Sequence, residues 1–375
     1  MQIGTYKPRK VEKVELNNYG IILAGGKGRR LWPYSTERIP KQFIDFFGVG
    51  RTQLQQTFDR IVNILPKENI YVSTNIAYID IVREQLPMLD EAQIIAEPIF
   101  RNTAPSVAWA IHRIGSLNPE ANVLIVPSDH NVINVEAFKQ DVCNGFSFVT
   151  SNDAVLTVGV EPTRFESGYG YLQKNEADSI GSIYKVQAFI EKPDADFASM
   201  FVGNGEWCWN TGMYISSVNY LRIILGQNLP PILRHFDALH SPYNVEAEDK
   251  YMQDYFAFYN NISLEECILE KQANVYVMEC KFGWADLGTW HNMYESIRTE
   301  NDENVVLNSE VFFEEATNNI IRMPKDKIAV IQGLDGYIVV EEGNVLLICK
   351  KDVSPSFIKK YINEVRMRRE KAKAK

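Results

Sequence analysis

The sequence has 375 residues, a formal net charge of -9 at pH 7, and hydrophobic and charged shares of 45% and 23%. This composition is typical of a globular protein with a substantial core, and the length exceeds that of one usual domain. The acidic balance argues against a general nucleic-acid-binding surface, because such surfaces carry a basic excess that neutralises phosphates. Any anion site must therefore be locally basic.

The cysteines and the N-terminal segment indicate in which cellular compartment the protein is expected. The five cysteines are scattered, with no short paired spacing, so neither a disulfide framework nor a zinc site is indicated. The first twenty residues are polar and lack the apolar core of a signal peptide, and no later run is suited to span a bilayer. We therefore expect a cytoplasmic protein with no membrane partner. The five histidines are too dispersed for a metal cluster.

The first informative segment is a short apolar strand, residues 21–24, followed at once by the sequence GGKG, residues 25–28. Glycines let bare backbone N–H groups approach an anion, and Arg30 and Lys41 then supply positive charge. The spacing matches neither the phosphate-binding loop that ends in Gly-Lys-Ser/Thr nor the dinucleotide fingerprint. Taken alone, such glycines more often form a mere tight turn between a strand and a helix than a ligand-binding loop.

Beyond this loop, helical and strand patterns alternate as far as residue 126. We expect helices over residues 54–65, 77–86 and 104–114, and strands over 70–74, 93–97 and 122–126. Strands that alternate with helices imply a parallel sheet, whose ligands bind beyond the carboxyl ends of the strands. The polar segments GGKGRR, EPIFRNT and PSDHN occupy those ends, so we expect them to converge.

From residue 154 the pattern is less regular, and this part is expected to hold a second substrate. Strands are expected over residues 155–160, 185–190, 212–216 and 273–279, with helical segments over 218–225 and 246–271. After residue 301, short strands separated by Gly, Asn and Asp turns predict a small all-β unit, followed by a helix from Pro355 with a basic tail. We therefore expect a catalytic domain over residues 1–300 and a β unit with a terminal helix over 301–375.

Two aspartates are candidate metal ligands. Asp129 lies just past the strand 122–126, where its side chain would point into the ligand crevice. Mg²⁺ prefers one or two carboxylates plus substrate phosphates, so a second acid on a separate loop is expected. Asp286, in the turn FGWADLGTW, fits that need. An aspartate in a turn is often only structural, so the pair is a stronger indication than either member.

Glu97 and residues 101–103 offer carboxylate and amide groups to the edge of a purine. A carboxylate can accept both N–H donors that guanine presents at N1 and N2. Alternatively, Asn102 or Thr103 caps the helix that begins near Ala104, and the two roles do not exclude one another.

Several residues of the second half could bind a sugar phosphate. Glu191 and Lys192 end a strand, where they could hold a hydroxyl group and a phosphate, or form a mere surface ion pair. Gly170 allows a close approach of the backbone, and Asn210 follows two tryptophans. Such an aromatic cluster is more often core than binding wall.

Together these segments carry a resemblance. LAGGKGRRLWP with PKQ at 40–42, EPIFRNTA, PSDH, EKP, WNTG and DLGTW occur in this order over most of residues 20–350. They resemble the mannose-1-phosphate guanylyltransferase family of the sugar-nucleotide nucleotidyltransferases, whereas AGGxGxRL alone would indicate only the superfamily. The resemblance implies an α/β fold: a Rossmann-like nucleotidyltransferase domain with a mostly parallel sheet, then a small all-β, β-helix-like C-terminal unit.

The resemblance also implies an activity: transfer of GMP from GTP to mannose 1-phosphate, with Mg²⁺ as cofactor, forming GDP-mannose and pyrophosphate. The catalytic residues would be Arg30, Lys41 and Asp129, and the metal ligands Asp129 and Asp286. The nucleotide would lie against Leu23, Ala24, Gly25, Gly26, Gly28, Glu97, Arg101, Asn102 and Thr103. The sugar phosphate would lie against Gly170, Glu191, Lys192 and Asn210.

One departure from the family pattern is Arg29, which stands where a small threonine is common and receives no role. Longer family members that also isomerise mannose 6-phosphate continue into a further domain; this chain ends before one, so isomerase activity is not expected. The C-terminal β unit is a candidate for self-association as a homodimer.

Three alternative functions stay open. One is another sugar-1-phosphate nucleotidyltransferase that uses glucose 1-phosphate with UTP or dTTP. A second is a catalytically silent regulatory homologue, although all four of Arg30, Lys41, Asp129 and Asp286 are present. The last is a dinucleotide-dependent oxidoreductase, which would need a third glycine that this loop lacks.

Overall fold

The structure is a computed structural model that describes residues 17–232, 234, 243–271, 274–300, 303–353 and 355–373. Several parts of the sequence expectations lie outside the described residues. They are the N-terminal segment 1–16, His235 and His240, the start of the strand expected at residue 273, residues 301–302 at the expected domain boundary, and the last two residues of the basic tail. The described chain forms two compact units. The first contains the residues up to Gly25, Thr57–Ser128 and Val132–Trp284, and the second contains Gly26–Gln56, Asp129–Asn131 and the residues from Ala285 onward. The expected domain division at residue 300 stays a prediction.

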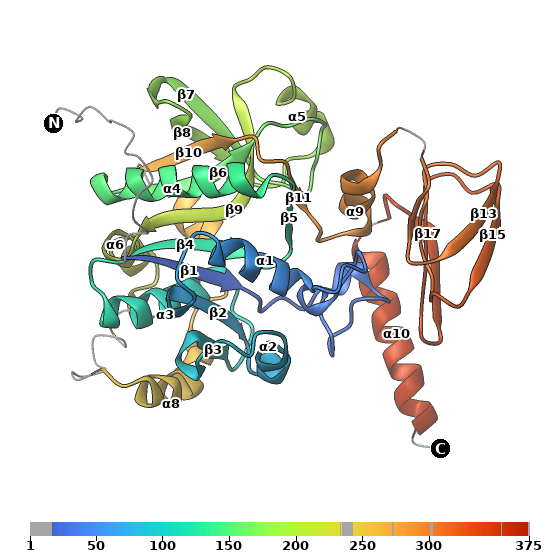
Figure 1. The fold of residues 1–375 in the computed structure, drawn as a ribbon, viewed down its shortest axis with the longest axis horizontal. Helices are drawn as coiled ribbons and strands as arrows, with labels where there is room; N and C mark the ends of the chain where they lie inside the picture. The colour runs from blue at the N-terminus through green and yellow to red at the C-terminus, as the bar shows by residue number, and fades with distance from the viewer. Residues whose placement is uncertain are drawn as a thin grey trace. The chain divides into compact units, whose positions relative to one another are not determined.

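The first unit is built on a nine-stranded sheet with the order β3-β2-β1-β4-β9-β6-β10-β8-β7 (Figure 1). Its strands are β1 (Asn18–Leu23), β2 (Ile70–Asn75), β3 (Ile94–Glu97), β4 (Asn122–Pro127), β6 (Val155–Val160), β7 (Tyr171–Ile180), β8 (Ile183–Ile190), β9 (Trp207–Ser217) and β10 (Val275–Cys280). β1 pairs in parallel with β2 and β4, and β2 pairs in parallel with β3. The α/β fold class is confirmed. Antiparallel pairing enters at β9, which joins β4 to β6 in the half where the sequence pattern is less regular.

Helices cover this sheet because its central strands are apolar on both faces. The first unit contains α2 (Ile79–Gln85), α3 (Thr103–Leu117), α4 (Val135–Ser151), α5 (Ala195–Met200), α6 (Val218–Asn228) and α8 (Val245–Tyr255), and α1 (Gln53–Val62) begins in the second unit. α3 packs on β1, β2 and α6, and α4 packs on β4, β6, β9 and β10. The core between these layers includes Ile21, Trp109 and Ile125, all fully buried. The helical region expected over 246–271 is α8, a 3-10 turn η6 (Phe256–Phe258) and a π-helix η7 (Glu265–Leu269).

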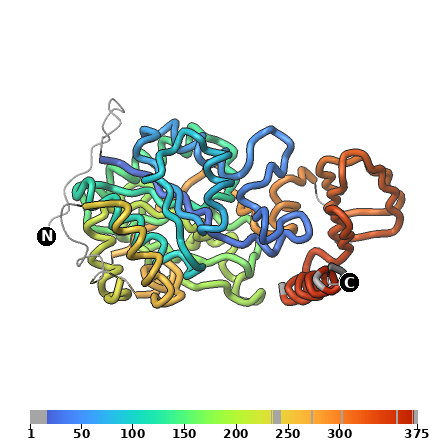
Figure 2. The backbone as a smooth tube through the Cα atoms, turned by 90° about the horizontal axis from the view of Figure 1, so that it is seen from below, coloured from blue at the N-terminus to red at the C-terminus, as the bar shows by residue number. Residues whose placement is uncertain are grey.

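The second unit contains stacked turns of chain at its C-terminal end (Figure 2). Its strands are β12 (Val305–Leu307), β13 (Glu310–Glu314), β14 (Ile320–Arg322), β15 (Ile328–Gln332), β16 (Tyr337–Glu342) and β17 (Val345–Lys350). β12, β14 and β16 pair in parallel, as do β13 and β15, while β17 pairs antiparallel with β16. The expected small β unit, with parallel strands in successive turns as in a β-helix, is confirmed.

The remaining elements of the second unit are short or helical. They are the 3-10 turns η1 (Arg29–Leu31) and η2 (Lys41–Phe43), α9 (Trp290–Ile297) and α10 (Pro355–Lys373). The short strands β5 (His130–Val132) and β11 (Trp284–Asp286) pair with one another. A core that includes Leu31, Trp290 and Val340 joins η1, α9 and the β strands. This packing holds the segments after the glycine loop and after Asp286 in one body.

Candidate active site

The glycine loop begins where β1 ends, and hydrogen bonds fix its first residues. The amide of Ala24 donates to the carbonyl of Ser73 at 2.8 Å, and the Thr74 hydroxyl donates to the carbonyl of Ala24 at 3.0 Å. The amide of Ser128 donates to the carbonyl of Leu23 at 3.1 Å. Strands β2 and β4 therefore hold the backbone that leads into Gly25.

Further along, the loop packs on the segment that carries Lys41. Gly28 has a φ of 60°, in the left-handed region, and a Cβ there would lie 2.8 Å from the backbone nitrogen of Lys41. Only glycine avoids both the backbone strain and this clash. The side-chain amide of Gln42 donates to the carbonyl of Gly26 at 2.8 Å. The Gly-rich and Pro-Lys-Gln segments are thus locked together.

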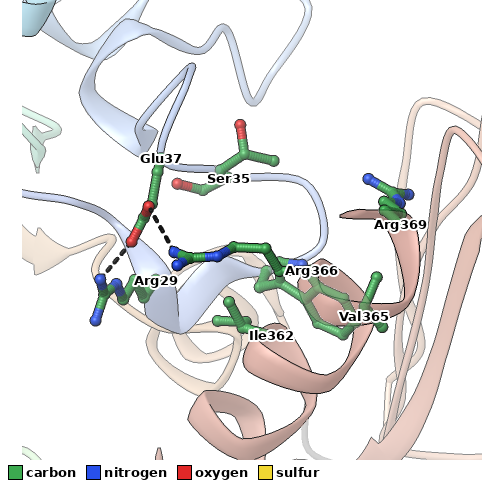
Figure 3. Close-up of a pocket in the computed structure, with 9 residues that line it drawn as sticks. Arg29, Ser35, Glu37, Ile362, Val365, Arg366 and Arg369 are labelled. Atoms are coloured by element: carbon green, nitrogen blue, oxygen red, sulfur yellow. Dashed lines mark hydrogen bonds and ion pairs between the residues drawn. The ribbon is translucent and has the colours of Figure 1, made fainter. Parts of the chain in front are cut away.

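The two neighbouring arginines differ in their surroundings. Arg29, the departure from the family pattern, forms an ion pair with Glu37 (Figure 3). Arg30 is exposed, and its charge contributes to the low pKa of Asp129. The structure therefore engages Arg29 with an acid of its own loop, whereas Arg30 acts electrostatically on the acidic site.

Lys41 and Asp129 form an ion pair, with side chains 13% and 15% exposed. Burial alone would raise the pKa of the Asp129 carboxyl, but Lys41 and, more weakly, His130 and Arg30 hold that pKa below its usual value. Asp129 is therefore a carboxylate at neutral pH, and Lys41 is its immediate counter-charge.

Asp286 faces the same small space as Lys41. A Cβ on Gly288 would lie 2.7 Å from Asp286 Oδ1 and 3.1 Å from Lys41 Nζ. The amide of Leu287 donates to the carbonyl of Asp129 at 3.2 Å, so the turn that carries Asp286 is attached at Asp129 itself. The structure thus brings together the two aspartates and the lysine that the sequence singled out.

This donor set fits a magnesium ion. Two carboxylates that leave coordination positions for water and substrate phosphates are what Mg²⁺ prefers in nucleotide sites. The missing side chain of Gly288 leaves room beside Asp286, and the side-chain amide of Asn292 donates to Asp286 Oδ2 at 3.4 Å. Among the described residues, no cluster of three or more His, Cys, Asp and Glu side chains forms a complete protein cage.

In the first unit, Glu97 lies close to Gly25. A Cβ on Gly25 would lie 3.9 Å from both carboxyl oxygens of Glu97, which is 4% exposed. Burial raises the pKa of Glu97 to about 7, and hydrogen bonds from Ser106 and Ser73 oppose that rise. The Ser73 hydroxyl donates to Oε1 at 2.7 Å. Sequence reasoning does not find either serine, whose only signal is a hydroxyl in an otherwise apolar strand or helix.

Residues 101–103 make contacts within the protein. The side chain of Asn102 accepts from the amide of Thr103 at 2.9 Å and caps α3, so the capping alternative is confirmed for Asn102. Arg101 Nε donates to the carbonyl of Ala257 at 3.1 Å, and the Thr103 hydroxyl accepts from the amide of Leu264 at 2.9 Å. These bonds fix the loop, and its contact with a nucleotide stays a prediction.

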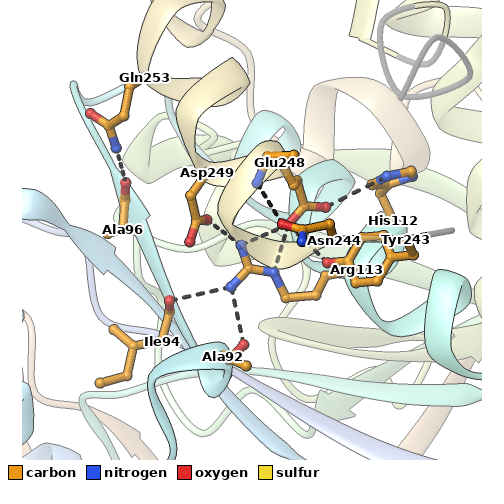
Figure 4. Close-up of polar contacts among 11 residues, drawn as sticks. Ala92, Ile94, Ala96, His112, Arg113, Tyr243, Asn244, Glu248, Asp249 and Gln253 are labelled. Carbon is orange, nitrogen blue, oxygen red and sulfur yellow. Dashed lines mark hydrogen bonds and ion pairs between the residues drawn. The ribbon is translucent and has the colours of Figure 1, made fainter. Parts of the chain in front are cut away.

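A buried charge cluster anchors the strand that ends at Glu97 (Figure 4). Arg113 is fully buried on α3; its Nε donates to Glu248 Oε2 at 2.7 Å, and it also pairs with Asp249. Its Nη1 donates to the carbonyls of Ala92, at 3.0 Å, and Ile94, at 3.4 Å. α3, α8 and the start of β3 are thereby tied together.

The four residues expected to bind the sugar phosphate lie together. The amide of Asn210 donates to the carbonyl of Gly170 at 2.8 Å, and a Cβ on Gly170 would lie 2.9 Å from Glu191 Oε2. Glu191 forms an ion pair with Lys192, whose side chain is 59% exposed and whose φ is 44°. The side chain of Asn210 accepts from the Thr157 hydroxyl at 2.8 Å. The structure therefore presents a carboxylate, a cation and an oriented amide side by side.

The tryptophans next to Asn210 belong to the core, which resolves the alternative left open by the sequence. Trp207 and Trp209 are 8% and 4% exposed and pack in one apolar cluster. Tyr169 contacts both Trp209 and Trp284, with ring centroids 5.2 Å apart in each pair. Arg164, which the sequence did not indicate, lies with its guanidinium carbon 5.1 Å from the centroid of the Trp209 ring.

Comparison with known proteins identifies the family. A family model described as nucleotidyl transferase matches residues 19–303. The chain belongs to this family. A mannose-1-phosphate guanylyltransferase of Salmonella muenchen is 30% identical to the chain, over 92% of this chain and 72% of that protein. A mannose-1-phosphate guanylyltransferase of Escherichia coli K12 is 29% identical, over 93% and 73%.

Solved structures agree on the fold. A structure from Thermus thermophilus, described as a mannose-1-phosphate geranyltransferase, has a TM-score of 0.81 with 24% identity, over 93% of this chain and 99% of that chain. The resemblance drawn from the sequence is confirmed, and with it the expectation of a nucleotidyltransferase enzyme.

The candidate residues of this nucleotidyltransferase fall in two sets. Lys41, Asp129 and Asp286 belong to the second unit, whereas Glu97 and the four sugar-phosphate candidates belong to the first. All five cysteines are free thiols. In the part of the chain that the structure describes, no helix has the length and apolar character needed to cross a membrane.

Proposed function

We propose that this nucleotidyltransferase transfers the guanylyl group of GTP to mannose 1-phosphate, forming GDP-mannose and pyrophosphate. The observation that carries the proposal is the Lys41–Asp129 ion pair beside Asp286, in a chain whose relatives bear the name mannose-1-phosphate guanylyltransferase. The cytoplasm is the proposed compartment, because the five cysteines are free thiols with no disulfide framework that would call for an oxidising compartment.

The proposed reaction needs no protein nucleophile. A phosphate oxygen of mannose 1-phosphate attacks the α-phosphorus of GTP, the new P–O bond forms, and the bond to the β-phosphate breaks with its electrons leaving on pyrophosphate. The attacking oxygen is already an anion, so the barrier lies in bringing two polyanions together and in stabilising charge on the leaving group. The chain must therefore supply positive charge and orientation.

Lys41 and Arg30 are the proposed sources of that charge, and the backbone N–H groups of residues 25–28 would donate to phosphate oxygens. Mg²⁺, held by Asp129 and Asp286, would neutralise and orient the phosphates of both substrates. In the proposed assignment Glu97 accepts the N–H groups of guanine. Glu191, Lys192, Gly170 and Asn210 would bind the sugar and its phosphate.

Pyrophosphate release tests the proposal. GTP, ATP, UTP and dTTP would each be combined with mannose 1-phosphate and glucose 1-phosphate, with and without Mg²⁺. The proposal expects the highest kcat/KM for GTP with mannose 1-phosphate, and turnover only with the metal. A higher kcat/KM for glucose 1-phosphate with UTP or dTTP would support the alternative substrate specificity. An absence of turnover with every pair would favour a catalytically silent homologue.

We also propose that the chain self-associates as a homodimer through the β unit. Its strands carry exposed apolar side chains: Phe312, Ile328, Val330, Leu346 and Ile348. A second copy of the same surface is an occupant that would cover them, because edge strands and exposed apolar side chains favour association. Light scattering coupled to size exclusion should give twice the mass of 42.9 kDa, and Val330→Lys should shift the protein to monomer.

A further inference from the structure

A cavity of about 320 Å³ lies in the second unit between α10 and the segment that follows the glycine loop. Its lining includes Arg29, Trp32 and Glu37 from that segment and Ile362, Arg366 and Arg369 from α10 (Figure 3). The volume is at the lower end of the range for small-molecule sites. It suits a compact ligand rather than a whole sugar nucleotide, and nothing in the proposed reaction uses it.

The charge of the lining selects an anion. Three arginines, Arg29, Arg366 and Arg369, and a single carboxylate, Glu37, line the cavity, and the guanidinium group of Arg369 donates to Asn344 Oδ1. Arg29 pairs with Glu37, and Arg366 Nη1 lies 3.9 Å from Glu37 Oε2. The hydrogen bond from Arg29, with the charges of Lys27 and Arg366, holds the pKa of Glu37 below its usual value although burial opposes this. The carboxylate is thus ionised, and positive charge remains in excess.

These ion pairs can exchange for a ligand. The side chains of Arg29, Glu37 and Arg366 are 41%, 43% and 64% exposed. Such exposed pairs contribute little stability, so a phosphate that offers bidentate acceptors to the guanidinium groups can compete with Glu37. Arginine is the side chain best matched to that geometry.

The other wall of the cavity is apolar. Trp32 and Ile362 pack with the core of the second unit, and Val365 adds a further aliphatic surface. An indole ring offers a flat face to an aromatic group. A ligand that satisfies both walls carries a phosphate and a planar ring.

We propose that this cavity is a binding site for an aromatic phosphate ester of about the size of a nucleoside monophosphate. Arg29, the position at which the chain departs from its family, then serves this site rather than the substrate triphosphate. The site does not depend on the proposed reaction.

The cavity is also connected to the glycine loop. Ser35 lines it and is fully buried, and a Cβ on Gly28 would lie 2.4 Å from the Ser35 hydroxyl oxygen. Among the described residues this hydroxyl has no hydrogen-bond partner. A ligand in the cavity would therefore contact the segment that packs against Gly28 and, through Gly28, against Lys41.

Calorimetric titration with adenosine monophosphate tests the proposal, with adenosine and inorganic phosphate as separate arms that supply only the ring or only the charge. Adenosine monophosphate should bind more tightly than either. The double variant Arg366→Ala/Arg369→Ala should weaken its binding about tenfold, since it removes two charge-assisted contacts. Glu37→Gln should strengthen binding about threefold, because it removes the competing carboxylate.

Two further variants show whether the nucleotide binds in this cavity. Arg368→Ala removes an exposed charge of the same helix that does not line the cavity, and it should leave binding unchanged. Lys41→Ala should also bind adenosine monophosphate as the unaltered chain does. Loss of binding in Lys41→Ala would place the nucleotide at the candidate active site. If Arg368→Ala weakened binding as much as the double variant, the loss of affinity would reflect only the general positive charge of the helix. No binding of the nucleotide to the unaltered chain would reject the site. Circular dichroism of each variant shows whether it is folded.

Discussion

Lys41 and Asp129, from segments far apart in the sequence, form an ion pair in which the side chains are only 13% and 15% exposed. Burial by itself would raise the pKa of the Asp129 carboxyl group, and the charge of Lys41 outweighs this and holds the pKa below its usual value. In the proposed function, Lys41 keeps the proposed metal ligand Asp129 ionised and also meets the phosphates of the substrate.

Replacing Lys41 by Met should therefore change how stability depends on pH. In the unaltered protein the pKa of Asp129 is lower when folded than when unfolded, so its contribution is present above the unfolded pKa and is lost as pH falls through the folded pKa. In Lys41→Met, burial raises that pKa, and the variant loses stability as pH rises through the unfolded pKa. Urea unfolding from pH 3 to pH 7 should show a difference that grows with pH, to about 3 kcal/mol.

The matched control is Lys327→Met. Lys327 forms an ion pair with Glu341, and its side chain is 47% exposed. Its effect should stay below about 1 kcal/mol at every pH. Pyrophosphate release should fall about a hundredfold in Lys41→Met and also in Asp129→Ala. A Lys41→Met difference that is constant with pH would contradict the electrostatic role, and near-normal turnover in folded Asp129→Ala would remove the metal assignment.

Gly288→Ala tests the space shared by Asp286 and Lys41. The new methyl group would lie 2.7 Å from Asp286 Oδ1 and 3.0 Å from Oδ2, so the carboxylate must move. The φ of Gly288 does not lie in the left-handed region, so the backbone should tolerate alanine. We expect a kcat lowered by about tenfold or more and an activity curve shifted to higher Mg²⁺ concentration, with little change in melting temperature. An unchanged Mg²⁺ dependence would show that Asp286 does not hold the metal.

Glu97→Gln separates stability from specificity. The folded pKa of Glu97 is about 7, above its ordinary value of 4.5, so the buried carboxyl costs stability as pH rises from about 4.5 to 7. The amide should therefore stabilise the protein at pH 8 by on the order of 3 kcal/mol, and by much less near pH 4. Glu91→Gln, at a side chain 72% exposed, is the control and should show no such gain.

The same variant tests base recognition. If the ionised carboxylate accepts both N–H groups of guanine, the KM for GTP falls as pH rises through about 7, while the KM for ATP does not. Glu97→Gln and Glu97→Ala should lose this dependence and much of the preference for GTP. Retention of the full preference in either variant would reject the assignment.

The sequence predicts elements that depend on local patterns better than contacts between residues far apart in the chain. The strands β1 and β4 follow from apolar runs such as Val123–Val126, and the loops at their ends follow from the geometry of a parallel sheet. α4 is absent from the expected elements although Phe138, Val142, Phe146 and Val149 recur at helical spacing, so this helix was predictable. β7 is also absent from the expected elements, but the sequence gives little sign of it, because its outer half is polar and exposed.

The partners of the site residues are beyond sequence reasoning. Nothing in the chain indicates that Ser73 meets Glu97, or that Glu37 engages Arg29, because each contact depends on how a turn directs two side chains. By contrast, the sequence predicts in outline that Asp286 lies near Asp129. Mg²⁺ prefers one or two carboxylates plus substrate phosphates, so a second acid on a separate loop is expected, and few polar turns offer one.

Gly170→Ala should weaken the binding of the sugar phosphate and leave the binding of GTP unchanged. The added Cβ would lie 2.7 Å from the Phe189 ring and 2.9 Å from Glu191 Oε2, which displaces the carboxylate beside Lys192. The KM for mannose 1-phosphate should rise by about tenfold while the KM for GTP changes little. Gly168→Ala is the control, since its nearest neighbour is the flexible carboxylate of Glu166 at 3.1 Å. A rise in both KM values would point to a general loss of structure.

Arg113→Met should be among the more destabilising single changes in the first unit. It leaves Glu248, 1% exposed, without its guanidinium partner, and the unfolding free energy should fall by about 3 to 5 kcal/mol. Asp249→Asn, at a side chain 40% exposed, should cost less than about 1 kcal/mol. Adding Glu248→Gln to Arg113→Met should recover part of the loss, because the unpaired buried charge is gone. Urea unfolding of the four proteins measures these differences, and a double variant no more stable than Arg113→Met would show that packing, rather than charge, dominates the cluster.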